Sequence, residues 1–432
     1  MHCRSLLHTV VICHHPPLST VVASSIGQVE DLLVLETSNA SILKEEFNID
    51  LRVMGILGSK SMLLSDAGIN LTRWRELREE RGEAADLEKF VQHVHGNNFI
   101  PNTALVDCTA DSVIAGYYYE WLRKGIHVVT PNKKANSGPL EQVKNCTLSF
   151  GWVVSIIDLS HVINAVEELT TYEGTDTPGQ TTVPANASEV QNTKGLTKYL
   201  RLRALQRQSY THYFYEATVG AGLPIVSTLR GLLETGDRIL QIEGIFSGTL
   251  SYIFNNFKDG RAFSEVVAEA KEAGYTEPDP RDDLSGTDVA RKVIILARES
   301  GLKLELSNIP VESLVPEPLQ VCASAQEFMQ ELPKFDQVFT KKQEDAENAG
   351  EVLRYVGVVD VINRKGVVEL RRYKKDHPFA QLSGSDNIIA FTTRRYKDQP
   401  LIVRGPGAGA QVTAGGIFSD ILRLASYLGA PS

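Results

Sequence analysis

Two short apolar runs, Ala104-Leu-Val-Asp-Cys108 and Ile126-His-Val-Val-Thr130, flank the segment Val113–Lys124 and decide the fold class of this chain. Each run has the length and near-continuous apolar character of a strand that is buried on both faces. The segment between them has helical periodicity and ends at Gly125, a residue type that commonly closes helices. A strand, a helix and a second strand at this spacing predict a βαβ unit, and therefore a parallel sheet.

The same alternation extends towards the N-terminus. Ser41–Phe47 is predicted to be the end of a helix, Leu51–Ile56 a buried strand and Leu87–His95 a helix. Thr109 and Pro131-Asn132-Lys133 directly follow two of the predicted strands. Because ligands bind at the carboxyl edge of an open α/β sheet, these residues are predicted to face a ligand.

Composition limits the class of protein. With 432 residues, 42% of them hydrophobic, the chain is long enough for two or three domains. A formal charge of −9 and a pI near 5.7 argue against a nucleic-acid binder, which usually presents a basic face. No apolar run reaches the ~18 residues of a membrane span. The five cysteines form no CxxC pair, which favours a reducing compartment without structural zinc.

The second half of the chain has a different pattern. Alternating segments at Leu353–Val361, Gly366–Tyr373 and Asn387–Thr393 predict an antiparallel or mixed sheet, accompanied by helices such as Phe263–Ala273 and Val289–Glu299. The predicted fold class is therefore α/β, with a Rossmann-like parallel-sheet domain followed by an α+β domain.

Two segments depart from this organisation. Residues 1–29 contain no acidic residue and one arginine, whereas a transit peptide would carry more arginine. Residues 143–198 contain no arginine, and Thr170–Thr193 is rich in Thr, Pro, Gly and Asn. This second segment is predicted to be an insertion, partly disordered and without a chemical role.

The run from Glu277 to Lys292, EPDPRDDLSGTDVARK, is the strongest candidate for a reactive site. Its two prolines predict that Glu277–Asp283 is extended or turned rather than helical. A helix follows, on which Asp288 and Lys292 share one face. A carboxylate beside an amine suits proton transfer, because each shifts the pKa of the other. The alternative is an exposed loop followed by an ordinary surface ion pair.

Several long motifs carry a family resemblance. They are VDCTAD (106–111), TPNKKANSGPL (130–140), YEATVGAGLPI (215–225), IEGIFSGTLSYIFN (242–255), GYTEPDPRDDLSGTDVARK (274–292), GSDN (384–387) and RGPGAGAQVTAGG (404–416). From about residue 40 onwards, except at 143–198, the chain resembles homoserine dehydrogenase. It is most like the C-terminal homoserine dehydrogenase part of the plant bifunctional aspartokinase–homoserine dehydrogenases.

The resemblance implies a reaction and its machinery. The reaction is reversible reduction of L-aspartate-4-semialdehyde to L-homoserine by NADPH or NADH, in threonine and methionine biosynthesis. Lys292 is then the catalytic acid/base, while Glu277 and Asp288 bind the substrate. The implied cofactor contacts are Thr109, Lys133 and Gly407. For Lys133 an alternative remains, a solvated lysine, and this is the expected state of Lys134.

The resemblance also implies a monovalent cation, sodium-like, at Glu216, Val219, Ala221 and Leu223. One carboxylate and three backbone carbonyls suit a hard ion, although the glycines of this loop serve equally to allow a tight turn. Asp282 and Asp283 are expected to cap their loop, and the histidines to be structural. A homodimer with a small-molecule substrate, without nucleic acid or membrane, is implied, in the plastid stroma or otherwise the cytoplasm.

One part of the family pattern fails. A Rossmann domain opens with a strand, a G-x-G-x-x-G turn and a helix that holds the pyrophosphate. Here residues 24–47 contain Gly27 alone, with Glu30-Asp31 where a phosphate needs neutral amides. The first strand and the glycine loop are therefore predicted to be missing. Ser59-Lys60 are candidates for contact with a 2′-phosphate.

The predicted domains are 1–40, an atypical N-terminus; 41–142, the NAD(P)-binding domain, completed by 405–432; 143–198, the insertion; and 199–404, the catalytic and dimerisation domain. The atypical segments fit a gene model with a wrong first exon and a retained intron. A second hypothesis for function follows from the missing loop. It is a non-catalytic remnant that keeps the substrate domain and dimer interface but binds no dinucleotide.

Overall fold

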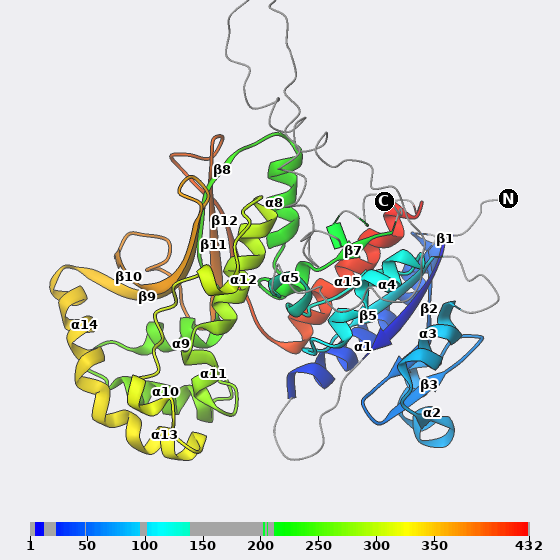
Figure 1. Ribbon diagram of the computed structural model, residues 1–432, viewed down its shortest axis with the longest axis horizontal. Helices are drawn as coiled ribbons and strands as arrows, with labels where there is room; N and C mark the ends of the chain where they lie inside the picture. The colour runs from blue at the N-terminus through cyan, green and yellow to red at the C-terminus, as the bar shows by residue number, and fades with distance from the viewer. Residues whose placement is uncertain are drawn as a thin grey trace, which may run out of the picture.

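The computed structural model describes residues 5–12, 23–47, 49–95, 102–138, 202–203, 205 and 211–430. The predicted insertion at 143–198 lies outside these residues, as does the link 13–22. The described chain forms two units, each built on one sheet (Figure 1).

The first unit contains a seven-stranded sheet in the order β4-β3-β2-β1-β5-β6-β7. Its strands are β1 (Ser5–Ile12), β2 (Ile49–Leu57), β3 (Ser61–Leu64), β4 (Glu83–Ala84), β5 (Thr103–Asp107), β6 (His127–Val129) and β7 (Tyr213–Phe214). Strands β2, β1, β5, β6 and β7 are parallel, and β3 and β4 add antiparallel pairs at one edge. The parallel sheet predicted from β2, β5 and β6 is confirmed.

Helices cover both faces of this sheet. They are α1 (Ala23–Glu45), α2 (Trp74–Arg81), α3 (Leu87–His95), α4 (Tyr118–Arg123), α5 (Lys134–Ser137) and, from the end of the chain, α15 (Ala410–Tyr427). Successive side chains of a strand point to opposite faces. Leu105 of β5 accordingly packs with the core that contains Phe90 and Trp121, while Val106 packs with the core that contains Leu33 and Ile417. Burial on both faces explains why β5 is apolar throughout.

The first strand, predicted to be missing, is present. Ser5–Ile12 lies between β2 and β5, with Leu7 opposite Leu51 and Val11 opposite Val106. The prediction was wrong because an apolar run is sufficient for a central strand, whether or not a glycine loop follows it. The strand also lies before residue 41, the predicted start of this domain. Since β1 is flanked by β2 and β5, the carboxyl end of β1 is a topological switch point.

The second unit contains a five-stranded antiparallel sheet in the order β10-β9-β8-β11-β12. Its strands are β8 (Ile239–Ile245), β9 (Glu351–Asp360), β10 (Lys365–Lys374), β11 (Asp386–Thr393) and β12 (Leu401–Pro406). Its helices are α8 (Ile225–Glu234), α9 (Gly248–Asn256), α10 (Phe263–Glu272), α11 (Pro280–Leu284), α12 (Thr287–Glu299), α13 (Ala325–Glu331) and α14 (Asp336–Asn348). The predicted antiparallel sheet is confirmed, and β12 is an additional edge strand.

Two local predictions differ from the structure. Val113–Lys124 is a 3₁₀ turn, Ile114–Gly116, followed by the short helix α4, rather than one helix. Within the segment predicted to be non-helical, α11 begins at Pro280. There the Asp279 side chain accepts a hydrogen bond from the Arg281 amide, 3.1 Å away. A proline is compatible with the first helical position, because the amide that it lacks has no partner there in any case.

The remaining short elements are 3₁₀ turns at Leu71–Arg73, Glu216–Thr218, Leu306–Asn308, Glu317–Leu319 and Leu332–Phe335. Among the described helices, none is both long and apolar enough to cross a membrane.

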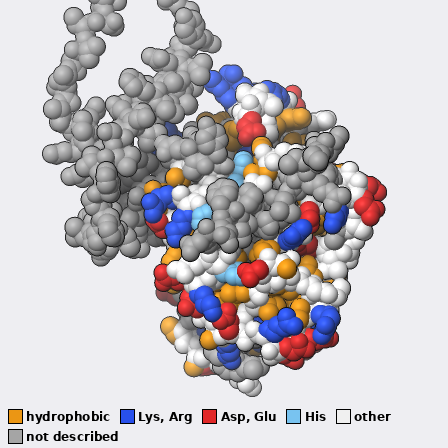
Figure 2. All heavy atoms as spheres, turned by 90° about the vertical axis from the view of Figure 1, so that its right-hand side faces the viewer, with side chains coloured by type: hydrophobic (Ala, Val, Ile, Leu, Met, Phe, Trp, Pro, Cys, Tyr) orange, Lys and Arg blue, Asp and Glu red, His pale blue; other side chains and the backbone are white. Residues whose placement is uncertain are grey.

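Figure 2 views the end of the molecule formed by the parallel sheet, where acidic and basic side chains are intermixed on the described surface. Exposed ion pairs occur in this unit, for example Arg75–Glu30 at 2.6 Å. Exposed pairs of this kind contribute only about 0–1 kcal/mol each.

Helix α12 lies where the two units meet, beside α5 of the first unit and against β9 and β10 of the second (Figure 1). A close approach of α12 to the second sheet is possible because β9 has glycine at position 357. A Cβ atom there would lie 2.5 Å from Val293 of α12. One hydrophobic core runs through both units and includes Leu105 and Val293. Side chains at the start of α12 are thereby held between the two units.

Candidate active site

Lys292 is the most enclosed ionisable group of the run from Glu277 to Lys292. Its side chain is 10% exposed, and its ammonium donates a 2.7 Å hydrogen bond to the carbonyl of Phe246. The ammonium also lies 2.9 Å from the Asp288 carboxylate, on the preceding turn of α12. The second oxygen of Asp288 lies 3.1 Å from Nζ of Lys133, just after β6. One carboxylate therefore joins two ammonium groups from the two units.

The charges in this cluster shift its pKa values. Burial lowers the pKa of Lys292; Asp288 opposes this effect, and Lys133 adds to it. Burial alone would raise the pKa of Asp288, but Lys133 and Lys292 outweigh it and hold that pKa far below the ordinary value. Asp288 is thus a permanent carboxylate, and Lys292 is closer to releasing its proton than a solvated lysine. The surface-pair alternative is incompatible with this burial of Lys292.

The backbone at the start of α12 fixes where Asp288 and Lys292 point. Gly286 precedes the helix with φ +71°, and a Cβ atom there would lie 2.1 Å from the hydroxyl of Tyr355. Only glycine avoids both the strained conformation and this clash. Asp288 then falls in the first turn, where a helix favours negative charge.

Further along α12, Arg298 ties the second unit to the first. Its side chain is 1% exposed, and it donates to the carbonyls of Asn136 and Gly138 at 2.6 and 2.9 Å. These carbonyls belong to the segment that follows Lys133. This role of Arg298 was not predicted from the sequence, where the available signal was an arginine in the otherwise apolar end of an amphipathic helix.

Glu277 stands at the entrance to α11. Its carboxyl is partly desolvated, and this, with Asp282 and Asp288, raises its pKa, whereas Lys133 opposes the rise. Its backbone amide donates a 2.7 Å hydrogen bond to the carboxylate of Asp283. Asp283 also lies 2.9 Å from the hydroxyl of Thr249, on α9. The predicted loop-capping role of Asp283 agrees with these contacts.

Burial raises the pKa of Asp283 to about 6, despite the hydrogen bonds from Glu277 and Thr249 that oppose the rise. Glu277, Asp283 and Asp288 thus surround the start of α12 with three carboxyl groups in different electrostatic states. Such divergence is typical of sites where acid and base roles are divided.

A buried polar network positions the residues after β5 and β6. Asp107 is fully buried and accepts hydrogen bonds from the amide of Thr109, at 2.8 Å, and from the side chain of Asn132, at 3.0 Å. Tyr118 and Thr130 complete the network through the carboxylate and the backbone carbonyl of Asp107. Thr109 is therefore fixed at the carboxyl edge of the sheet, as predicted. Asn132, which precedes Lys133 in the chain, belongs to the same network.

Gly407 lies between β12 and α15, in contact with β11. A Cβ atom at this position would lie 1.9 Å from Nδ2 of Asn387, so the Asn387 amide packs directly on the glycine backbone. The next residue, Ala408, lies beside Gly248, because a Cβ atom there would be 3.5 Å from the Ala408 Cβ. The glycine loop accordingly meets the start of α9, one residue before Thr249.

The predicted cation ligands surround a turn that precedes α8. Both oxygens of Glu216 accept backbone hydrogen bonds, from Val226 at 2.7 Å and Ser227 at 2.9 Å, and Arg423 lies 3.6 Å away. Ala221 has φ +52°, which turns the chain that carries the predicted carbonyl ligands. The carboxylate thus caps the N-terminus of α8, while two of its roughly four lone-pair positions remain available.

Two further observations concern the surroundings. Ser59-Lys60 are exposed and follow β2, at the same sheet edge as Thr109.

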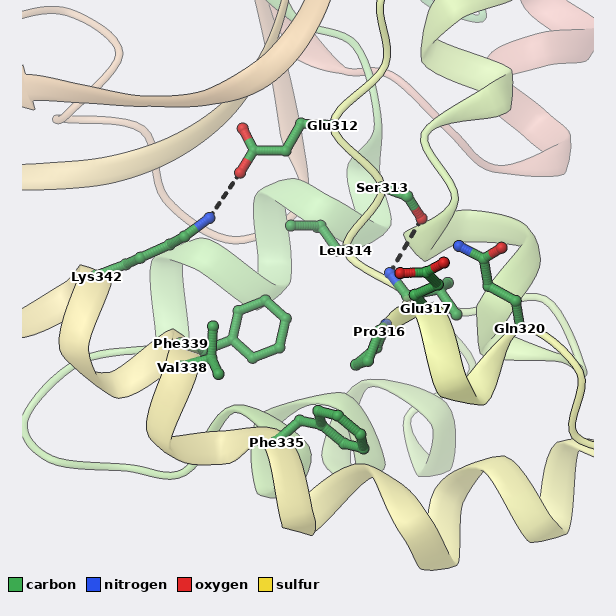
Figure 3. A pocket seen from close by; sticks show the side chains of 11 residues that line it. Glu312, Ser313, Leu314, Pro316, Glu317, Gln320, Phe335, Val338, Phe339 and Lys342 are labelled. Carbon is green, nitrogen blue, oxygen red and sulfur yellow. Dashed lines mark hydrogen bonds and ion pairs between the residues drawn. The ribbon is translucent and has the colours of Figure 1, made fainter.

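A pocket of about 460 Å³ lies elsewhere in the second unit, between the segment 312–320 and the start of α14 (Figure 3). Phe335 and Phe339 line its base, and the Glu312–Lys342 ion pair, at 2.7 Å, spans its rim. None of the predicted site residues line it, so it is a separate feature.

A parallel sheet with a switch point is joined here to an antiparallel domain, whose Asp288 and Lys292 meet Lys133 of the first unit. This is the architecture of a two-domain dehydrogenase. Residues 224–422 match the family model for homoserine dehydrogenase, and residues 34–148 match the model for the NAD-binding domain of homoserine dehydrogenase. The chain belongs to the homoserine dehydrogenase family.

Curated relatives agree. The chain is 67% identical over 393 residues to bifunctional aspartokinase/homoserine dehydrogenase 2, chloroplastic, of Arabidopsis thaliana, which covers 91% of this chain and 37% of the relative. It is 42% identical over 366 residues to the homoserine dehydrogenase of Schizosaccharomyces pombe, which covers 83% of this chain and 82% of that protein. The chain thus spans little more than a third of the length of the plant relatives.

Solved structures share the fold. A Candida auris protein of unknown function is 32% identical, with a TM-score of 0.76 and 99% coverage of both chains. A hyperthermophilic archaeal homoserine dehydrogenase in complex with NADPH has a TM-score of 0.60 at 20% identity, with 97% coverage of both chains.

The family implies a nicotinamide dinucleotide, and this chain fits it unequally. At the reacting end, the amide of Asn387 packs against Gly407, and this buried amide has no partner among the described residues. At the phosphate end, residues 13–26, which follow β1, contain no glycine. The residues thus suit the nicotinamide better than the pyrophosphate.

Proposed function

We propose that this chain catalyses the reversible, NAD(P)H-dependent interconversion of L-aspartate-4-semialdehyde and L-homoserine. The observation that carries the proposal is the Lys133–Asp288–Lys292 cluster, in which one carboxylate lies 3.1 and 2.9 Å from two ammonium groups. Such a cluster supplies a proton beside a site for a small charged substrate.

The proton donor is Lys292. When the aldehyde is reduced, its oxygen becomes an alkoxide and takes the Lys292 proton; in the reverse direction Lys292 accepts the hydroxyl proton. The bound dinucleotide supplies or accepts the hydride. Burial lowers the pKa of Lys292, so its ammonium releases a proton more readily than that of a solvated lysine. The Phe246 carbonyl, 2.7 Å from Nζ, keeps the ammonium aimed in one direction.

The substrate is an amino acid, so its ammonium needs carboxylates. Glu277 and Asp288 are the carboxylates suited to that role. Asp288 in particular stays ionised at all ordinary pH values. Lys133 is paired with Asp288 and follows the sheet edge where Thr109 lies, so it is suited to contact both substrate and cofactor. A solvated Lys133 is less consistent with this ion pair and with its 29% side-chain exposure.

The same proposal includes three finer points. A sodium-like ion binds the remaining oxygen positions of Glu216 and the carbonyls of Val219, Ala221 and Leu223, and it orders the loop rather than reacting. The protein is a homodimer. It acts in the plastid stroma, as the chloroplastic relatives suggest. Mass measurement in solution, sodium-dependent melting and imaging of a tagged protein test these points separately.

Titration of NADPH fluorescence with the purified protein, followed by homoserine-dependent reduction of NADP⁺, tests the main proposal. Dissociation constants of about 1–100 μM, a free energy of roughly −8 to −5 kcal/mol, together with turnover, are the expected result. No binding at millimolar NADPH would instead favour the non-catalytic remnant. That second hypothesis rests on the absence of glycine from residues 13–26.

A further inference from the structure

Asn387 is a buried polar side chain without an explanation in the fold. It lies in β11 and is completely buried, and neither Oδ1 nor Nδ2 has a hydrogen-bond partner among the described residues. Because both atoms are unpartnered, this finding is the same for either orientation of the amide. Buried polar groups in folded proteins are almost always satisfied, so a partner of Asn387 is to be sought in a bound molecule.

The position of Asn387 relates it to the reacting groups. Ile388 pairs with Ile245 across the antiparallel β11–β8 ladder, so Asn387 stands opposite Phe246 at the end of that ladder. The carbonyl of Phe246 is the one that accepts a hydrogen bond from Lys292. Opposite residues of an antiparallel pair lie about 5 Å apart at their Cβ atoms. Asn387 therefore stands opposite the residue whose carbonyl holds the proton donor.

The opposite side of the Asn387 amide is defined by Gly407. A Cβ atom at position 407 would lie 1.9 Å from Nδ2 of Asn387, so any side chain there would displace the amide. In the antiparallel β11–β12 ladder, Asn387 is paired with Gly405, so the amide borders the start of the whole glycine segment. This segment touches α9 through Gly248, next to Thr249 and the carboxylate of Asp283. Asn387 thus lies at the meeting point of the glycine loop and the substrate-binding elements.

The chemistry of the side chain selects its ligand. A primary amide offers both donor hydrogens and an acceptor oxygen. A carboxylate could satisfy only Nδ2, and an ammonium only Oδ1. A carboxamide satisfies both, through two antiparallel N–H···O hydrogen bonds. Of the reactants in the proposed function, the nicotinamide ring alone carries a carboxamide.

We propose that Asn387 binds the carboxamide of the nicotinamide ring, in a paired amide–amide contact against the backbone of Gly407. This inference rests on the proposed function. The contact fixes the rotation of the ring about the bond to its ribose, so that one face of the ring is presented towards Lys292. Asn387 is in this sense a residue that determines specificity for the carboxamide, and the Gly407 backbone gives it the room to do so.

The test compares NADP⁺ with its 3-acetylpyridine analogue, in which a methyl group replaces the amide nitrogen. Isothermal titration gives both dissociation constants, so turnover is not required. The unmodified protein is expected to bind NADP⁺ about tenfold more tightly than the analogue, as the loss of one hydrogen bond in a desolvated site implies. In Asn387→Leu the ratio is expected to fall to about one. Asn348→Leu, the same change at an exposed position at the end of α14, is the control and is expected to keep the ratio of the unmodified protein.

Three outcomes overturn the inference, and they are distinguishable. Equal binding of the two dinucleotides by the unmodified protein, a result that needs no variant, overturns it and leaves the proposed function intact. An unchanged ratio in Asn387→Leu with a raised melting temperature also overturns it, and identifies Asn387 as a water-binding structural site. Absence of binding for either dinucleotide overturns both this inference and the proposed function.

Discussion

The region around α12 and the region after β1, which the proposed function assigns to opposite ends of the cofactor, differ in completeness. Around α12, Lys133, Asp288 and Lys292 are joined by contacts of 2.9–3.1 Å, and Arg298 clamps the two units together. After β1, residues 13–26 contain none of the glycines that allow a backbone to wrap a pyrophosphate.

In the proposed function, proton transfer and dinucleotide affinity depend on separate parts of the chain. The first needs a few side chains held rigidly in one geometry, and the second needs backbone amides in a glycine-dependent turn. Each part can change while the other stays intact. The comparison therefore makes different predictions for kcat and for cofactor binding.

Removal of the proton donor is expected to have the largest effect. Lys292→Ala is predicted to lower kcat by about 10²–10⁴-fold, the usual contribution of a positioned acid/base. NADPH binding, measured by fluorescence, should stay nearly unchanged, since the lysine contacts Phe246 and Asp288 rather than the phosphate end. Lys341→Ala, an exposed lysine on α14, is the control. Full kcat in Lys292→Ala would reject the role assigned to this lysine.

Restoring a glycine loop is expected to act on affinity alone. The triple change Cys13→Gly, His15→Gly and Leu18→Gly creates a G-x-G-x-x-G pattern directly after β1. Each amide gained on a charged phosphate contributes about 1.5–3 kcal/mol, so the NADPH dissociation constant should fall by at least tenfold. The same three positions changed to alanine are the matched control. If the glycine and alanine triples bind NADPH equally, the phosphate end does not limit affinity in this chain.

Gly407 is expected to be the most sensitive glycine at the reacting end. In Gly407→Ala the new methyl group would lie 1.9 Å from Asn387 Nδ2, so KM for NADPH should rise about tenfold and the melting temperature should fall. Gly415→Ala, inside α15, meets no atom within 4 Å and should stabilise the protein by about 0.5–1 kcal/mol. The two variants, measured side by side, separate a steric effect from a general effect on α15.

The smallest effect is expected from Asp283. Burial raises its pKa from 3.8 to about 6, so the folded state holds the proton more tightly than the unfolded state. Its stabilising contribution is then complete below about pH 4 and is lost as the pH rises through 6. In Asp283→Asn, the unfolding free energy at pH 4 minus that at pH 7 should be ~1 kcal/mol lower than in the unmodified protein, allowing for partial solvent screening. Denaturant unfolding at the two pH values measures it, and an unchanged difference would contradict the assignment.

Much of the fold could be predicted from the sequence, because buried strands such as β5 are apolar throughout and α12 has clear helical periodicity. Strand β1 was not predicted, since a strand identified through its glycine loop is overlooked when the loop differs. Strand β12 was not predicted either, because at a sheet edge its side chains alternate between half-buried and exposed. The helix α11 was overlooked because two prolines suggested a loop, although Pro280 occupies the one helical position that favours proline.

The site was predicted where its residues share one short segment. Asp288 and Lys292 are four residues apart, so helical geometry alone joins them. The hydrogen bond from Lys292 to Phe246 spans 46 residues, and the bond from Arg298 to Asn136 spans 162. Contacts at such separations depend on how distant segments pack in three dimensions, and one sequence does not contain that information. The same reason hides the unpartnered state of Asn387.

The two-sided attachment of α12 restricts how this part of the chain can change. Asp288 and Lys292 are used at one end of the helix, and Arg298 at the other, with the two units as fixed partners. Deleting or inserting one residue between them would rotate one end by about 100° relative to the other. Either the proton donor or the clamp would then face away from its partner. This helix can therefore accept substitutions but not changes of length. The ten-residue interval from Asp288 to Arg298 must be kept for both ends to reach their partners in the first unit.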